Sequence, residues 1–218
     1  MTWSETTVVV VGVLLLLAWW LWVMASRLDR LHRKVAASRS VVQAQLLRRA
    51  SAAADLAAAG VLDPVSAVLV GEAAWAALAA GGDAARRVDV PAELGHLVDT
   101  TADPSPEDRG AVESDLSATL REVLDDPDEV AAIRSEPEGA DALDALAAAW
   151  YRVHLARRFH NEAVAQTQRV RRSRRVRWLR LAGHAPEPET LELDDAWPEA
   201  LGRPGQVAGV PGGERPAL

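Results

Sequence analysis

An arginine-rich run at residues 169–180 has the clearest capacity for binding chemistry in this chain. It contains no acidic residue, and its candidate contacts are Arg169, Arg171, Arg172, Arg174, Arg175, Arg177, Trp178 and Arg180. Guanidinium groups bind phosphate oxygens, and tryptophan prefers the level of lipid headgroups. The run therefore predicts contact with anionic lipid headgroups. Two alternatives stay open: nucleic-acid binding, and a solvated helix end whose cations face the negative pole of the helix dipole.

A second candidate set is polar and is shared between two segments with helical periodicity. Gln45 and Arg49 lie in the first of these segments, and Arg157 and Asn161 lie in the last. If the two helices are neighbours, these side chains form a hydrogen-bonded layer, because buried polar groups need partners. Such a layer can set the register between helices. We interpret the set as a structural polar layer, with a ligand site as the alternative.

Histidines and acids do not form a convincing metal or catalytic set. His154 and His160 are six positions apart, whereas two ligands on one helix face are expected four apart. The chain has no cysteine, which excludes thiolate chemistry. Neither a phosphate-binding glycine loop nor a nucleophile elbow occurs. The sequence therefore predicts no catalytic residue, no cofactor and no metal site, and we interpret the chain as a protein other than an enzyme.

The element that must position these residues begins with the apolar run Val8–Met24, which contains no charged residue. With its flanks, this run is long enough to cross about 30 Å of hydrocarbon. Tryptophans lie at both ends, at Trp3 and at Trp19, Trp20 and Trp22, as expected at membrane interfaces. A buried core helix and a cleaved signal peptide are the alternatives. The signal peptide is disfavoured because residues 2–7 lack Lys and Arg.

Basic residues on the C-terminal side of the run predict its orientation. Arg27, Arg30, Arg33, Lys34 and Arg39 follow the run, whereas only Glu5 precedes it among charged side chains. The positive-inside rule then leaves the N-terminus outside and the rest of the chain in the cytoplasm. We therefore expect a single-pass protein of the inner (plasma) membrane, with the lipid bilayer and unknown proteins as partners.

The remaining sequence predicts an all-α fold. Helical periodicity continues from the anchor to Ala59 and returns at Val65–Ala80, Glu107–Asp126 and Gly139–Leu181, with a short turn at Glu129–Arg134. Gly60 and Asp63-Pro64 are typical stop and start signals. These amphipathic segments predict an antiparallel up-and-down four-helix bundle.

The charge and composition of the other segments set the expected domain limits. Residues 83–144 hold 18 acids against five arginines, so an acidic surface is available to partners. Residues 185–218 are rich in proline, glycine and acids, which predicts a largely disordered tail in which 191–193 and Trp197 dock transiently. The expected domains are an anchor at 1–26, a bundle at 27–184 and a tail at 185–218.

Two segments together resemble the LemA family. They are Ser40-x-Val42-x-x-Gln45-Leu46-x-Arg48-Arg49 in the first helix and Ala156-Arg157-Arg158-Phe159-His160-Asn161-Glu162-Ala163-Val164 in the last. Residues 120–133 are also similar to the middle helix and turn of that family. The resemblance implies a diverged member with an N-terminal anchor and a four-helix bundle at the inner membrane. It implies no reaction.

Two functions follow from these observations. The first is a membrane-anchored scaffold or interaction protein, for which the anchor, the bundle and the uneven charge distribution are the reasons. The alternative is a membrane-tethered regulatory or nucleic-acid-binding protein that uses the run 169–180. An enzyme is the third and weakest interpretation, because no catalytic constellation is present.

Overall fold

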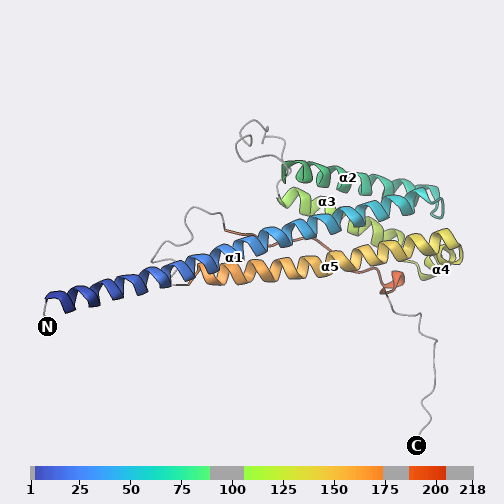
Figure 1. Ribbon diagram of the computed structural model, residues 1–218. Helices are drawn as coiled ribbons and strands as arrows, with labels where there is room; N and C mark the ends of the chain where they lie inside the picture. The colour runs from blue at the N-terminus through green and yellow to red at the C-terminus, as the bar shows by residue number, and fades with distance from the viewer. Residues whose placement is uncertain (1–2, 89–105, 174–186, 205–218) are drawn as a thin grey trace, which may run out of the picture. The chain divides into compact units, whose positions relative to one another are not determined.

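The computed structural model describes residues 3–88, 106–173 and 187–204, and these residues form helices without any β-strand. The α-helices are α1 (Trp3–Ala58), α2 (Pro64–Val88), α3 (Pro106–Val123), α4 (Pro127–Ser135) and α5 (Pro137–Arg171), followed by the 3-10 turn η3 (Glu199–Leu201) (Figure 1). The all-α class is therefore confirmed.

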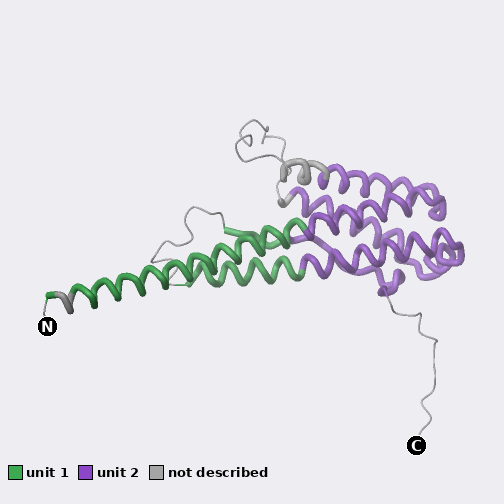
Figure 2. The backbone as a smooth tube through the Cα atoms, viewed as in Figure 1, with its two compact units in different colours: residues 1–40, 158–190 green, residues 41–157, 191–218 purple. Residues whose placement is uncertain are grey.

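The chain divides into two compact units (Figure 2). Unit 1 comprises residues 1–40 and 158–190, and unit 2 comprises residues 41–157 and 191–218. Because α1 and α5 are continuous, each contributes one part of its length to unit 1 and the other part to unit 2.

Helix boundaries follow the local signals in the sequence. Gly60 has φ of 72°, the left-handed conformation that commonly follows a helix C-terminus. The side chain of Asp63 accepts hydrogen bonds from the backbone N–H groups of Val65 (2.9 Å) and Ser66 (3.2 Å), which caps α2. Asp126 caps α4 in the same way. Proline occupies the first position of both helices, where its missing N–H costs nothing.

The N-terminal part of α1 is apolar enough and long enough to span a membrane, and none of its most apolar window is buried. Val8 is 72% exposed and Leu16 is 71% exposed. Residues 64–81 of α2 also pass this test of length and composition. However, α2 buries Val70, Ala74 and Ala77 in the core of unit 2, so part of its surface is committed to packing.

The core of unit 2 receives side chains from all five helices. Its buried residues include Leu56 of α1, Leu120 of α3, Ile133 of α4 and Trp150 of α5. Helices α2 and α3 lie side by side within this unit (Figure 1). Apolar spacing in the sequence predicts one buried stripe on α1, and every residue of this stripe is buried except Leu31, which is partly buried. The stripe comprises Leu28, Leu31, Val35, Val42, Leu46, Ala50, Ala53 and Leu56.

Three details of the predicted helices are wrong. Helix α2 continues through Gly81 to Val88, because Gly81 is buried where a Cβ atom would lie 2.4 Å from Leu47 Cδ2. Tertiary packing here outweighs the poor helix propensity of glycine. The expected short turn at 129–134 is the capped helix α4. The apolar spacing of the last helix predicts that Phe159 lies on its buried stripe, but Phe159 is 63% exposed and the buried face passes through His160 and Val164 instead.

Apolar spacing predicts that Val65, Val68, Leu69, Ala73, Trp75 and Leu78 form the buried face of α2, and this prediction is wrong in part. The first three residues and Trp75 are between 47% and 68% exposed, whereas Ala73 and Leu78 are partly buried and the smaller Val70, Ala74 and Ala77 are fully buried. Small residues allow helix backbones to approach closely, and this favours their burial. The large apolar side chains are left on the surface, where contiguous exposed patches commonly mark contact sites.

The expectation of a largely disordered tail is wrong for residues 187–204. Leu193 and Leu201 are 8% and 2% exposed, and both belong to hydrophobic clusters of unit 2. The composition of the tail is that of a disordered segment, but a few apolar residues are enough to seat it on a folded surface. Residues 205–218 lie outside the described part, as do residues 89–105.

Candidate functional site

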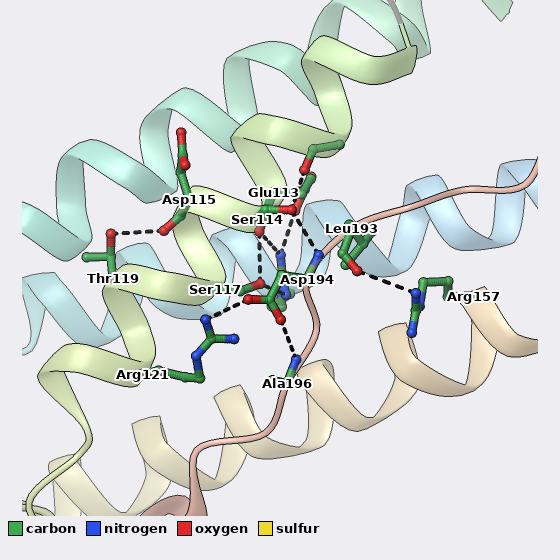
Figure 3. Close-up of polar contacts among 12 residues, drawn as sticks. Glu113, Ser114, Asp115, Ser117, Thr119, Arg121, Arg157, Leu193, Asp194 and Ala196 are labelled. Atoms are coloured by element: carbon green, nitrogen blue, oxygen red, sulfur yellow. Dashed lines mark hydrogen bonds and ion pairs between the residues drawn. The ribbon is translucent and has the colours of Figure 1, made fainter.

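A buried arginine lies at the centre of the polar residues in unit 2. Arg49 of α1 is 0% exposed and donates to Ser117 Oγ at 2.8 Å through NH1. Its NH2 donates to Glu113 Oε2 and to the Glu113 carbonyl oxygen, both at 2.9 Å. The guanidinium also lies 5.3 Å from the centre of the Trp150 ring. Arg49 thus contacts α3 through Glu113 and Ser117 and contacts α5 through Trp150. Figure 3 shows the two α3 residues.

Helical spacing explains why these groups meet. Arg49 lies three positions after Leu46, on the buried stripe of α1, and Glu113 and Ser117 lie on the stripe that carries Leu116 and Leu120. Each charged group therefore enters the core at a position that would otherwise hold an apolar side chain. A buried charge requires an opposite charge and hydrogen bonds, and the two helices supply both.

Burial dominates the ionisation of this pair. It raises the pKa of Glu113, and the attraction of Arg49 and Arg109 only partly opposes it. It also lowers the pKa of Arg49, against the attraction of Glu113. Burial thus disfavours the charged form of both groups, and in buried ion pairs the cost of desolvation commonly offsets much of the mutual attraction. The network is therefore suited to specifying which helices pair, and it adds little to net stability.

Arg109 places a second cation on the same carboxylate. Its NH2 lies 3.9 Å from Glu113 Oε1, one helical turn away on α3, and its side chain is 9% exposed. Glu113 consequently accepts a hydrogen bond from Arg49 through Oε2, whereas Oε1 faces Arg109 and is buried without a hydrogen-bond partner.

Two consecutive acids of the tail complete the polar region. Asp194 pairs with Arg121 of α3 at 2.6 Å, and its Oδ1 accepts a hydrogen bond from the backbone N–H of Ala196 (Figure 3). The hydrogen bond from Arg121 lowers the pKa of Asp194. Asp195 pairs with Arg157 of α5 at 2.8 Å and with His154 Nδ1 at 3.0 Å. The tail thus binds α3 through one carboxylate and α5 through the next.

The predicted polar layer of Gln45, Arg49, Arg157 and Asn161 is divided in the structure. Arg49 binds Glu113 and Ser117, whereas Arg157 binds Asp195 and the carbonyl oxygen of Leu193. Asn161 belongs to unit 1, and Gln45 Oε1 is buried without a hydrogen-bond partner. The physical reason is charge: each arginine requires an acid, and the predicted set contains none.

Sequence reasoning missed Glu113, Ser117, Asp194 and Asp195. A signal for Glu113 was available, since an arginine on a buried stripe implies an acid on the buried stripe of a neighbouring helix. Asp194 and Asp195 had no comparable signal, because the composition of their segment is that of a disordered tail.

The predicted lipid-contact residues lie partly inside the described segments. Arg171 NH1 lies 3.2 Å from His32 Nε2, Arg172 pairs with Glu187 at 3.3 Å, and Arg169 Nε donates to Ala165 O at 3.3 Å. Arg174, Arg175, Arg177, Trp178 and Arg180 lie outside the described residues.

His160 packs within unit 1 and is not arranged as a metal ligand. It is 4% exposed, and its Nδ1 lies 2.9 Å from Ser38 Oγ. His154 binds Asp195 in unit 2. Within residues 3–88, 106–173 and 187–204, no group of three or more His, Asp or Glu side chains could hold a metal ion.

We expect His160 to make unit 1 sensitive to mild acid. Burial lowers the pKa of His160, and Arg39 lowers it further. The unfolded chain, with a histidine pKa of about 6.5, then binds more protons than the folded chain as pH falls through this range. Stability should therefore fall as pH falls from 7.5 to 5. Denaturation midpoints of the wild type and of His160→Gln should diverge, the variant being less pH-dependent. Parallel curves would contradict this prediction.

The described polar residues of unit 2 hold helices and a tail segment together, since Glu113, Asp194 and Asp195 each pair with an arginine. Comparisons of this chain with models of protein families, with curated proteins and with solved structures found no match.

Proposed function

We propose that this chain is a membrane-anchored helical scaffold or interaction protein of the LemA-like type. The observation that carries the proposal is the continuity of α1, whose exposed apolar N-terminal part leads directly into residues that build the core of unit 2. A helix of this kind ties a folded body to a bilayer. The further details proposed are an inner-membrane location, the N-terminus outside, and an antiparallel up-and-down four-helix bundle in the cytoplasm.

Reporter fusions at Leu218 test the anchor and its orientation. A fluorescent protein fused there should be bright and membrane-bound, because basic residues after the apolar run keep the C-terminal side in the cytoplasm. Alkaline phosphatase at the same position should be inactive. A variant in which Arg27, Arg30, Arg33 and Lys34 become Gln serves as the control and should lose part of this preference. Active phosphatase on the wild-type chain would overturn the orientation.

The exposed apolar face of α2 supports a role in interaction. Val68 and Trp75 are 59% and 68% exposed, and Glu72 is the one charged residue between Pro64 and Gly81. A photo-crosslinking amino acid at position 75 should therefore yield a discrete protein adduct in intact cells. The same amino acid at Tyr151, which is 44% exposed on α5, is the matched control. Equal or absent adducts at both positions would count against the scaffold.

We also propose that residues 169–180 bind anionic lipid headgroups. Each basic residue near an anionic surface contributes about 1 kcal/mol, and the attraction fades over about 8 Å. A fragment of residues 27–218 should bind anionic vesicles and be released by salt. Changing Arg171, Arg172, Arg174 and Arg175 to Gln should abolish binding, whereas changing the exposed Arg48, Arg152, Arg158 and Arg203 should not. Binding to DNA in place of vesicles would favour the nucleic-acid alternative.

A further inference from the structure

Residues 191–197 are seated on unit 2 in the manner of a bound peptide. They have no regular secondary structure, and they follow the extended alternation in which successive side chains point to opposite sides. Leu193 is 8% exposed and the side chain of Asp195 is 10% exposed, whereas that of Asp194 is 45% exposed. The inward side therefore reads Leu191, Leu193, Asp195 and Trp197, at every second position.

We call the surface that receives this segment the tail-docking surface; its residues are Val42 and Leu46 of α1, Gly110, Ser114 and Arg121 of α3, and Trp150, Val153, His154 and Arg157 of α5. Leu193 packs with Val42, Leu46 and Val153. The ring of Trp197 lies 5.9 Å from that of Trp150. Apolar contacts of Leu193 and Trp197 thus lie on either side of the ion pair that Asp195 makes with Arg157.

The backbone of the segment approaches α3 at a glycine. A Cβ atom on Gly110 would lie 2.6 Å from the carbonyl oxygen of Glu192, closer than real side chains come to a backbone oxygen. Ser114 Oγ, one turn further along α3, accepts from the N–H of Asp194 at 2.9 Å. Gly110 costs α3 helix propensity but leaves room for a peptide backbone. The surface is therefore shaped for main chain as well as for side chains.

Three nitrogen donors of the tail-docking surface find no hydrogen-bond acceptor on the tail. Arg121 NH1 and Arg157 Nε are buried and have no hydrogen-bond partner, although both arginines pair with tail carboxylates through other nitrogens. Trp150 Nε1 is also buried without a partner. An extended segment with the same alternation and with acceptors at these nitrogens would fit better than the tail does.

We propose that the tail-docking surface is a binding site for an extended acidic segment of a partner protein with the pattern Leu-x-Leu-Asp-Asp-x-Trp, and that residues 191–197 occupy it as a displaceable internal ligand. The two arginines recognise consecutive carboxylates, and the apolar positions fix the register. This site lies wholly in unit 2, so the inference is independent of the membrane anchor and of the lipid contacts proposed above.

Covalent attachment explains how residues 191–197 can occupy the tail-docking surface even if their intrinsic affinity for it is low. A short linker gives an attached segment an effective concentration on the order of 1 mM, so a segment with a dissociation constant of about 10 µM occupies its site almost fully in cis. On the same basis, the tether weakens binding of a competing peptide of equal affinity about 100-fold. Cutting the tether should remove this disadvantage.

The test uses the full-length chain in detergent with a protease recognition sequence inserted after Gly183, and a fluorescein-labelled peptide of residues 187–204 as the probe. After cleavage and removal of the released tail, the chain should bind the probe about 100-fold more tightly than the uncut chain. Salt should weaken this binding. No binding to the cut, folded chain would overturn the proposal.

Two variants separate docking from folding. Gly110→Ala should improve the helix propensity of α3 yet block the probe, because the added methyl group meets the peptide backbone. A probe with Ala196 and Trp197 exchanged keeps the composition but turns the tryptophan to the wrong side, and it should bind at least about 10-fold more weakly. Equal binding in either case would overturn the proposal.

If the insertion prevents folding, the full-length Asp194→Asn/Asp195→Asn variant serves instead. Its own tail loses the ion pairs with Arg121 and Arg157 while the surface stays unchanged. It should bind the wild-type probe about 10-fold more tightly than the wild-type chain does, since charge-assisted hydrogen bonds are the stronger ones. An unchanged affinity would count against displacement of the tail.

Discussion

Replacement of Arg49 by leucine should lower the free energy of unfolding by about 3–5 kcal/mol, because it leaves the Glu113 carboxylate buried without its main partner. Glu113 is 1% exposed, and Arg109 offers it only a distant contact of 3.9 Å. Ser117 would also lose the donor that now lies at 2.8 Å. Denaturant unfolding of the full-length chain in detergent, followed by circular dichroism, measures the loss.

The neighbouring residue provides a matched control. Arg48 is exposed, so Arg48→Leu removes the same charge and adds the same side chain outside the core, and it should change stability by less than about 0.5 kcal/mol. The double variant Arg49→Leu/Glu113→Leu should recover much of the loss, because no charge is then left in the core. A loss below about 1 kcal/mol for Arg49→Leu would contradict the description of this pair.

The same variant should respond to pH. Burial already raises the pKa of Glu113, and removal of Arg49 takes away the attraction that opposes this rise. A carboxyl group with a raised folded pKa contributes stability below its unfolded pKa and loses it as pH rises through the folded value. The difference in stability between Arg49→Leu and the wild type should therefore shrink as pH is lowered toward 5. Other carboxylates change the free energy of unfolding with pH in both proteins alike, so their effects cancel when the variant is compared with the wild type at each pH.

Gly139→Ala should destabilise unit 2 by about 3 kcal/mol, although alanine is the better helix former. A Cβ atom on Gly139 would lie 2.2 Å from the carbonyl oxygen of Ile133, and this neighbour is backbone that cannot rotate away. Helices α4 and α5 are separated by Glu136 alone, so relief requires movement of a whole helix. Both helices contribute buried residues to the core, and such movement disturbs it.

Gly71→Ala is the control for Gly139→Ala. An added Cβ atom at Gly71 would meet Ala57 Cβ at 3.9 Å, an ordinary van der Waals contact. Removal of a glycine from a helix interior should then stabilise the chain by about 0.5–1 kcal/mol. Thermal unfolding should show opposite shifts for the two substitutions. Shifts of the same sign would mean that the close approach of α5 to Ile133 is absent.

The fold class and the apolar N-terminal part of α1 could be predicted because they depend on local properties. The apolar run, the caps at Asp63 and Asp126 and the stripe of α1 are each readable from residue type and spacing within one segment. The face of α2 could not be predicted, because α2 carries both large apolar and small side chains. Which of them enters the core depends on how closely its neighbours approach, as the burial of Gly81 against Leu47 illustrates.

The sequence by itself determined that this chain is helical, that it begins with a segment apolar enough to cross a membrane, and that it contains no cysteine chemistry. Tertiary structure alone decided the partners of its buried charges. Arg49 meets Glu113 across 64 positions of sequence, and Arg157 meets Asp195 across 38. Hydrophobic periodicity indicates only that a side chain faces inward. The acid that pairs with a buried arginine depends on which helix or tail segment packs against that arginine. Charges in the core must be paired with groups that are close in space, and these need not be close in sequence.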